Sequence, residues 1–355
     1  MRPRIVAFHL PQFHRIDEND AWWGEGFTEW ANVRRGKPWF SWHEQPHVPG
    51  ELGYYDLMDP SVRDAQAALA ASHGVDAFCY YHYWFKGRRL LEKPVEAILA
   101  SGEPDFPFCL AWANEPWSRA WDGGERQVLM PQEYDEADHR AHAEHLSCVF
   151  SDRRYLEVEG RPVFLVYKAS KIPDVQEAVR IWRDVWEGRG FAQPFLVRME
   201  SMALEKGDPR PLGFDASVEF QPAWREMRFP DNAVLRYAAR LFGRRIPAVH
   251  DYARLASRMA AMPQPSWPRF PGLTPMWDNT CRRGGCGLVL RDSTPEAYGR
   301  WLDACMAKAS KLPLRDPLVF VNAWNEWGEG CHLEPDLKHG RAFLEETARR
   351  AKTRG

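Results

Sequence analysis

Eight short apolar runs with β-strand character recur along this chain of 355 residues, and segments with helix signals separate them. Continuously apolar runs that alternate with helices are typical of parallel strands whose sheet is covered on both faces. Eight such repeats favour a closed (β/α)8 TIM barrel over an open sheet, so we predict an α/β fold with a single barrel domain over residues 1–355. The expected strands are residues 5–10, 75–81, 106–112, 163–167, 195–198, 216–220, 273–277 and 318–323.

Two helices between these strands have clear boundary signals. Asp59 and Thr294 are each followed by proline, which places an N-cap residue before a first-turn proline. The first of these helices is expected to end at His73 and Gly74, because glycine commonly follows the last helical residue. Trp182 and Trp186 stand at helical spacing with apolar neighbours and are expected in the core.

Two long segments interrupt the regular alternation. Residues 11–59 follow the first strand and hold five tryptophans with little helical periodicity, so we expect an elaborated Trp-rich loop. Residues 222–271 are expected to form a helical insertion between strands six and seven. Its basic residues favour a solvated helical face, and the alternative is a basic lip that meets an anionic glycan or a membrane-proximal, lipid-linked glycan. They are Arg225, Arg228, Arg236, Arg240, Arg244, Arg245, Arg254, Arg258 and Arg269.

Charge and composition exclude several classes of function. The formal net charge of −2 gives no global electrostatic case for nucleic acid or an anionic membrane, so any recognition must be local. No run of about 20 apolar residues predicts an integral membrane segment, and the first residues lack a signal pattern, so a cytoplasmic location is expected. The seven scattered cysteines fit reduced thiols. Cys281 and Cys286 lack two further ligands at suitable spacing, so no metal and no cofactor is expected. The oligomeric state is not predicted.

Polar and aromatic residues gather just after the expected strands, where the active site of a barrel of this class lies. Many of the 17 tryptophans stand beside Gly, Asn, Glu or Pro, which indicates a surface cleft. We therefore predict a ring of glycan-binding side chains at these strand ends. Its members are His9, Gln12, Trp23, Glu29, Tyr81, His82, Trp112, Asn114, Glu115, Trp117, Arg198, Glu219, Trp277, Trp324 and Asn325.

The segment after the eighth strand carries the strongest chemical signal. Glu326 and Glu329 stand three residues apart among tryptophans and glycines. Carboxylate pairs supply the proton transfers of glycosidic bond cleavage, and indole rings stack on sugars. If residues 325–330 form a helical turn, both carboxylates lie on one face of it. We predict that Glu326 and Glu329 are catalytic.

Four motifs resemble the WbsX family over nearly the whole chain. They are His9–His14 (HLPQFH), Asn19–Trp30 (NDAWWGEGFTEW), Ala111–Glu115 (AWANE) and Asn325–Gly330 (NEWGEG). WbsX proteins resemble glycoside hydrolase family 99 and occur in polysaccharide and lipopolysaccharide O-antigen biosynthesis settings. The resemblance implies a (β/α)8 barrel and endo-acting, retaining catalysis on mannose-type sugars. It also implies the roles within the Asn-Glu-Trp-x-Glu-Gly motif: Glu326 deprotonates the sugar 2-hydroxyl, which forms a 1,2-anhydro sugar, and Glu329 protonates the leaving group.

Three functions follow in order of preference. The first is a metal-independent retaining glycoside hydrolase or transglycosylase that acts on an oligosaccharide or polysaccharide. The second is a glycosyltransferase of surface-polysaccharide assembly, because WbsX proteins are also described in that way. No Asp-x-Asp metal motif is present, and Gly24 and Gly26 lack the third glycine of a nucleotide-binding loop. The third is a glycan-binding protein without catalysis, which the presence of both motif carboxylates disfavours.

Overall fold

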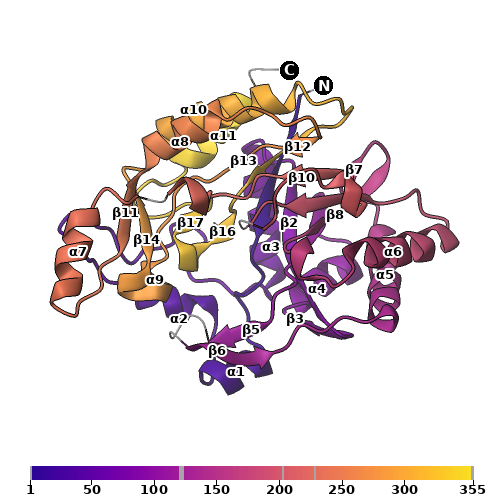
Figure 1. The fold of residues 1–355 in the computed structure, drawn as a ribbon, viewed down its shortest axis with the longest axis horizontal. Coiled ribbons are helices and arrows are strands. Elements are labelled where there is room, and N and C mark those ends of the chain that lie inside the picture. Colours follow the sequence, from indigo (N-terminus) through magenta and orange to yellow (C-terminus); the bar gives the residue numbers. More distant parts are fainter. Residues whose placement is uncertain (1, 120–123, 202–203, 228, 353–355) are drawn as a thin grey trace.

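The computed structural model describes residues 2–119, 124–201, 204–227 and 229–352, and its centre is a parallel barrel (Figure 1). Strand runs that are almost fully buried form the sheet, as expected for strands covered on both faces. The (β/α)8 prediction is confirmed. In spatial order the strands are β12 (Arg269–Phe270), β10 (Ala216–Val218), β9 (Phe195–Met199), β8 (Arg161–Val166), β4 (Phe108–Trp112), β2 (Ala77–Phe85), β1 (Arg4–His9), β15 (Leu318–Val321) and β13 (Gly272–Leu273).

The two terminal strands of that order, β12 and β13, are one stretch of chain, and this closes the barrel. β12 pairs with β10 and β13 pairs with β15, with only Pro271 between them. The prediction of strand seven at residues 273–277 was therefore wrong by about one strand length. Pro271 lacks an N–H and broke the apolar pattern, but its carbonyl still accepts a hydrogen bond from Phe320 N at 3.0 Å.

Aromatic rings fill the interior of the barrel. The ring of Phe8 lies 5.5 Å from that of Phe220 and 5.4 Å from that of Phe320, centroid to centroid. Tyr81 stacks on the same ring at 5.8 Å. Because Tyr81 and Phe220 also line the cavity described below, this aromatic layer is the floor on which the site is built.

Helices cover the barrel, and their ends agree with the sequence signals. α3 (Pro60–Ser72) is capped by Asp59, and α10 (Pro295–Ala309) is capped by Thr294, whose side chain accepts from Ala297 N at 3.2 Å. Trp182 and Trp186 of α6 (Val175–Gly188) are buried, as predicted. The remaining covering helices are α4 (Lys93–Ser101), α5 (Glu136–Phe150), α8 (Tyr252–Ala261) and α11 (Ala342–Lys352).

The segment after β1 contains more structure than its sequence predicted. Two short helices, α1 (Asp17–Trp23) and α2 (Glu29–Arg34), interrupt the Trp-rich loop. Trp30 packs with Phe13 and Trp327 in a second apolar core outside the barrel. This core ties the N-terminal segment to the loop that follows the last barrel strand.

The insertion before strand seven contains the two expected helices, α7 (Ala233–Leu241) and α8, after a 3-10 turn η4 (Trp224–Glu226). It also contains β11 (Ala248–Asp251), which the sequence did not predict. β11 pairs in parallel with β14 (Leu288–Arg291) in a separate two-stranded sheet. Figure 1 shows α7 at the edge of the molecule, far from α5 and α6. Arg228 of the predicted basic group lies outside the described residues.

Candidate active site

Glu326 and Glu329 lie in a tight turn after the last barrel strand. β16 (Asn325–Glu326) pairs antiparallel with β17 (Cys331–His332), and a 3-10 turn η6 (Trp327–Glu329) joins them. Residues three apart eclipse in 3-10 geometry, so the expected helical turn is present in its tighter form. The turn ends at Gly330, whose φ of +54° is a left-handed conformation that favours glycine.

One guanidinium group joins both glutamates to a third. Arg282, on α9 (Thr280–Arg283), lies 2.7 Å (Nη2) from Glu326 and 3.2 Å (Nη1) from Glu329. Its Nε donates to Glu29, the first residue of α2, at 2.7 Å. Three carboxylates therefore share one buried cation, and the planar guanidinium group meets each of them through a different nitrogen.

Gly328 leaves room for this cluster. A Cβ atom at position 328 would lie 1.8 Å from Glu29 Oε1 and 2.5 Å from Arg282 Nε. No side chain fits there unless the ion pair moves. The glycine of the Glu326–Glu329 turn is thus required by close packing against the arginine.

Burial and mutual repulsion shift both carboxylates toward the protonated form. Burial raises the pKa of Glu326 to about 8, the charges of Glu329 and Glu29 add to the rise, and Arg282 opposes it. Burial also raises the pKa of Glu329, again against the effect of Arg282. The side chain of Glu329 is 27% exposed and that of Glu326 only 8%. Both carboxyl groups therefore bind a proton more readily than an exposed glutamate does, which suits paired acid and base catalysis.

The two glutamates open into a cavity of about 660 Å³ at the C-terminal ends of the strands. Aromatic rings form much of its wall, and Arg282 and Arg283 lie on the same side as the acids. Of the predicted residues, the cavity is lined by Gln12, Trp23, Tyr81, Glu115, Trp117, Trp277, Glu326 and Glu329. Glu29 is connected to the cavity only indirectly, through its ion pair with Arg282.

Two tyrosines on β2 add hydroxyl groups to the cavity. Burial first, and the charge of Glu326 second, raise the pKa of both Tyr81 and Tyr83. Each hydroxyl therefore stays protonated at physiological pH and can donate a hydrogen bond to a sugar oxygen or a carboxylate.

Two predicted asparagines make strand-end bonds instead of lining the cavity. Asn325 Oδ1 accepts from Leu10 N at 2.7 Å and its Nδ2 donates to Leu10 O at 3.0 Å. Asn114 does the same with Lys168, at 2.8 Å in both directions. These side chains extend the parallel pairing past the last backbone bond, so each fixes where the following loop begins.

Other predicted residues point from their strands toward the helices. His82 alternates with Tyr81 and Tyr83 on β2, and its Nε2 lies 3.0 Å from His142 Nε2 on α5. Burial lowers the pKa of His82. Trp112 is fully buried and donates to Trp84 O at 3.3 Å. His9 Nε2 lies 3.2 Å from Gln66 Oε1 on α3, and burial lowers its pKa to about 3.

The remaining predicted residues lie at the rim or in the core. Arg198 donates to the carbonyls of Lys206 and Gly207 at 3.1 and 2.6 Å. Glu219 lies 3.0 Å from Arg269 in a smaller cavity of about 280 Å³ beside the main one. Trp324 is fully buried, with its ring 5.0 Å from that of Phe78. The structure thus separates these side chains from the Glu326–Glu329 pair.

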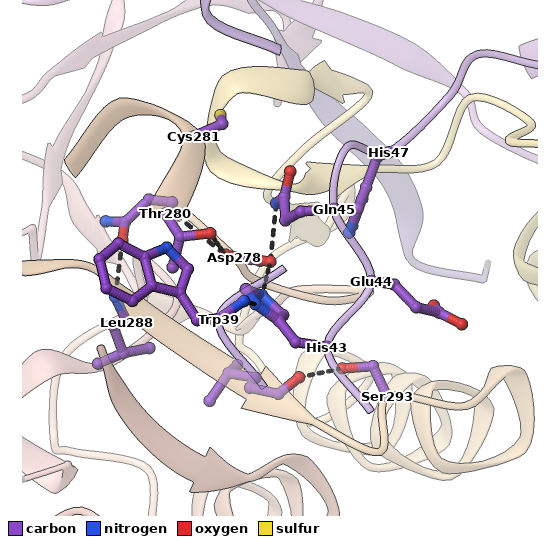
Figure 2. Close-up of polar contacts among 12 residues, drawn as sticks. Trp39, His43, Glu44, Gln45, His47, Asp278, Thr280, Cys281, Leu288 and Ser293 are labelled. Carbon is purple, nitrogen blue, oxygen red and sulfur yellow. Dashed lines mark hydrogen bonds and ion pairs between the residues drawn. The ribbon is translucent and has the colours of Figure 1, made fainter. Parts of the chain in front are cut away.

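A buried aspartate holds the arginine-bearing helix against the N-terminal segment (Figure 2). Asp278 Oδ2 accepts from His43 Nε2 at 2.6 Å and from Gln45 Nε2 at 2.7 Å. Trp39 N donates to Nδ1 of that histidine at 2.9 Å, so Nε2 carries the proton. Burial alone opposes ionisation, but the hydrogen bonds from His43 and Thr280 and the nearby histidines hold the pKa of Asp278 below its usual value.

The same aspartate also contacts the glutamate turn. Asp278 N donates to Glu329 O at 2.7 Å, and Cys281 Sγ donates to Gly328 O at 3.1 Å. Residues near positions 40, 280 and 328 are therefore locked together, and Arg282 is held where it meets the carboxylates. Among the described residues, no group of three or more His, Cys, Asp or Glu side chains is arranged to hold a metal ion.

Sequence reasoning missed Arg282 and Tyr83. Tyr83 could have been found, because side chains two apart on a strand share a face with Tyr81. Arg282 had no comparable signal: it lies 44 positions before Glu326 and meets it only through the fold. Its segment stood out in the sequence only because Cys281 and Cys286 raised the question of a metal site.

A family model described as "Glycosyltransferase WbsX" matches residues 5–347 of the chain. The chain belongs to the WbsX family. Over 352 residues it is 42% identical to the protein WxcX from two Xanthomonas campestris pv. campestris strains. This alignment covers 99% of the chain and 50% of WxcX, so the chain spans about half the length of these relatives.

Solved structures of glycoside hydrolases share the WbsX barrel at low sequence identity. An endo-alpha-mannosidase of glycoside hydrolase family 99 from Bacteroides thetaiotaomicron, in complex with Bis-Tris-propane, superposes with a TM-score of 0.60 and 14% identity. The match covers 98% of this chain and 96% of that one. A glycoside hydrolase-like protein gives a TM-score of 0.62 at 12% identity, over 99% and 94% of the two chains. The shared architecture is the (β/α)8 barrel.

Proposed function

We propose that this WbsX protein is a retaining, metal-independent glycoside hydrolase or transglycosylase that acts on a polysaccharide. The observation that carries the proposal is the Arg282 cluster, in which Glu326 and Glu329 face an aromatic-walled cavity at the C-terminal end of the barrel. Two carboxyl groups with raised pKa values beside indole and phenol rings suit acid and base chemistry on a sugar. The barrel shared with a family 99 endo-alpha-mannosidase supports mannose-type sugars as the first substrates to test.

In the proposed first step, Glu326 is the base. It takes the proton of a sugar 2-hydroxyl, and the resulting oxygen attacks the anomeric carbon as the glycosidic C–O bond breaks. A carboxylate with a raised pKa is a stronger base toward a weakly acidic hydroxyl, and the 2.7 Å contact with Arg282 keeps its ionised form accessible. The product of this step is a 1,2-anhydro sugar.

Glu329 is the proposed acid. It is more exposed to the cavity than Glu326 and lies farther from Arg282, so it can reach the leaving oxygen and deliver its proton. In the second step it takes a proton from water, whose oxygen opens the anhydro ring at the anomeric carbon, and the 2-hydroxyl regains its proton from Glu326. Two inversions give net retention.

Replacing water by a sugar hydroxyl in the second step gives transglycosylation with the same residues. The description of the family model favours glycosyl transfer, so a glycosyltransferase of surface-polysaccharide or lipopolysaccharide synthesis is the second candidate. Calorimetry with a panel of nucleotide sugars separates it from hydrolysis. Saturable binding of one nucleotide sugar, without cleavage of any polysaccharide, would replace the first proposal with the second.

The roles are tested with substrates that differ in leaving group. Released sugars from a panel of mannans and bacterial polysaccharides are followed by NMR, which should show the retained anomer first. Glu329→Gln should lose more activity on the glycan than on a glycosyl fluoride, since fluoride leaves without a proton. Glu326→Gln should lose both, and Glu345→Gln on α11 is the matched surface control. Equal losses on both substrates for Glu329→Gln would contradict its role as acid. If the unaltered protein binds a glycan but turns over none, a glycan-binding protein without catalysis becomes the favoured function.

A further inference from the structure

The insertion before strand seven exposes an unusual concentration of apolar side chains. Seven of the 14 large exposed hydrophobic residues in the described chain fall between positions 224 and 242. Phe229 is 87% exposed, Val234 84% and Phe242 82%. Soluble proteins rarely present so many large apolar groups together without a use for them. We call Phe229, Val234, Tyr237, Leu241 and Phe242 the α7 patch.

Helix α7 is amphipathic, and its apolar face is the one turned outward. Val234, Tyr237 and Leu241 follow a spacing of three and four residues, which places them on one side of the helix. None of the residues of α7 is buried, and its partly covered positions are Arg236, Ala238 and Ala239. Packing against the rest of the protein therefore does not account for its apolar face.

The charge along α7 and the turn that follows it has a single sign. Residues 232–250 contain four arginines, Arg236, Arg240, Arg244 and Arg245, and no aspartate or glutamate. Within the described part of the chain, no carboxylate forms an ion pair with Arg236, Arg240 or Arg244. The net charge of the whole chain is −2, so this cationic segment is a local feature.

Apolar side chains flanked by unpaired arginines match the chemistry of an anionic lipid surface. We propose that the α7 patch docks this protein on a bilayer, with the apolar rings at the boundary of headgroups and acyl chains and the arginines on lipid phosphates. The chain has no helix, among the residues described, that is long and apolar enough to cross a membrane. Such docking is peripheral and reversible.

The segment that follows the α7 patch contacts a residue that lines the main cavity. Arg245 follows α7, and its Nη1 donates to Cys286 Sγ at 3.2 Å. Cys286 and Trp224 both line the cavity. Trp39 lies close to the loop that carries Cys286, because its ring is 3.7 Å from the place where a Cβ atom on Gly284 would be. Trp39 and Trp42 are both exposed, and such aromatic groups also suit a membrane interface.

Docking through α7 would hold the cavity mouth next to the headgroups, so the substrate would be a glycan attached to a lipid. This part of the inference rests on the proposed glycan activity, whereas lipid binding does not. The two are therefore measured separately.

Flotation with vesicles tests the docking. The unaltered protein should float with vesicles of equal parts phosphatidylglycerol and phosphatidylcholine, and not with phosphatidylcholine alone, and added salt should release it. The triple variant Val234→Ser, Leu241→Ser, Phe242→Ser should bind the anionic vesicles about tenfold more weakly or worse, as should Arg236→Gln with Arg240→Gln. Leu337→Ser and Arg315→Gln are matched exposed controls that should bind normally.

The circular dichroism spectrum and the urea denaturation midpoint should be unchanged in the α7 variants, which shows that they are folded. No flotation of the unaltered protein, or equal flotation of the α7 variants, would overturn the proposal whatever the enzymatic activity. If the protein instead forms oligomers that the triple variant abolishes, and does not float, the patch is an interface between copies of this chain.

Discussion

Glu326 and Glu334 are two buried carboxyl groups in the same loop, and they differ in what surrounds them. Glu334 accepts hydrogen bonds from Tyr55, Gln66 and Trp327 at 2.6 to 2.8 Å and is only 2% exposed. Glu326 shares Arg282 with two other carboxylates and lines the cavity. Burial raises the pKa of both, to about 7 for Glu334 and about 8 for Glu326.

A perturbed pKa therefore does not by itself mark a reactive group. What separates the two is whether the remaining lone pairs and the exposed surface face protein donors or a space where a substrate can bind. Glu334 fixes Trp327, whose ring stacks on His332 at 3.7 Å, and so supports the glutamate turn from below. Glu326, by contrast, directs its carboxylate toward the cavity.

The largest expected difference between the two is in turnover. Glu326→Gln should lower kcat by about 1000-fold, because the neutral amide cannot take a proton from the sugar hydroxyl. Glu334→Gln should stay within about tenfold of the unaltered protein, since its effect on the reaction is indirect. Initial rates on the best glycan of the panel measure both. Comparable losses in the two variants would erase the distinction.

Arg282→Gln should have the next largest effect, a loss of about 100-fold in kcat/KM, and should also move the pH profile. Arg282 lowers the pKa of Glu326 and of Glu329, so its removal raises both values. The rising limb of kcat/KM, which reports ionisation of the base, should shift to higher pH. Arg282→Lys is the control: it keeps the charge but places it on a single nitrogen in place of the planar guanidinium fork. An unshifted limb in Arg282→Gln would show that this arginine does not set the ionisation of the pair.

For Glu334 the expected loss is in stability. Glu334→Gln keeps one acceptor oxygen but turns its amide N–H groups toward at least one of the three donors, which should lower the free energy of unfolding by about 2 kcal/mol. Urea denaturation measures it. A neutral result would mean that the loop tolerates the loss of these bonds and that Glu334 is not its support.

The smallest expected effect is a gain in stability on removing the proposed base. The folded-state pKa of Glu326 is raised from the ordinary 4.5, so the stability of the unaltered protein falls as pH rises from about 4.5 to about 8. Glu326→Gln escapes this loss and should be about 1 kcal/mol more stable at pH 8, with less gain at pH 5. Urea denaturation at the two pH values tests the sign. A gain that is larger at pH 5 would reverse the assignment.

The barrel and the position of the acids could be predicted from the sequence because both rest on local pattern. Apolar runs predict the strands. In a parallel barrel the residues that follow each strand lie on the same rim, so one placement rule predicts the site. The rule cannot tell which face of a strand a residue takes when both faces are buried, so it grouped His82 with Tyr81. It also included Asn114 and Asn325, because a side chain that bonds the next strand looks polar and well placed in sequence alone.

Arg282 could not be predicted for a different reason. Its role depends on α9 being held by Asp278, and Asp278 is in turn held by His43 and Gln45 from a segment more than 230 positions earlier. Three loops from distant parts of the chain must be placed together before the charge of this arginine has any meaning. No periodicity or spacing encodes such a placement.

The two hydrogen bonds between Leu10 and Asn325 join residues 315 positions apart. During synthesis, the first barrel strand therefore waits without this partner until nearly the whole described chain has been made. Glu326 and Glu329 are added only after that point, so a chain that ends before residue 325 lacks both proposed catalytic groups and the link between β1 and the loop that carries them. Synthesis through residue 325 is therefore a condition for assembling the proposed site beside it.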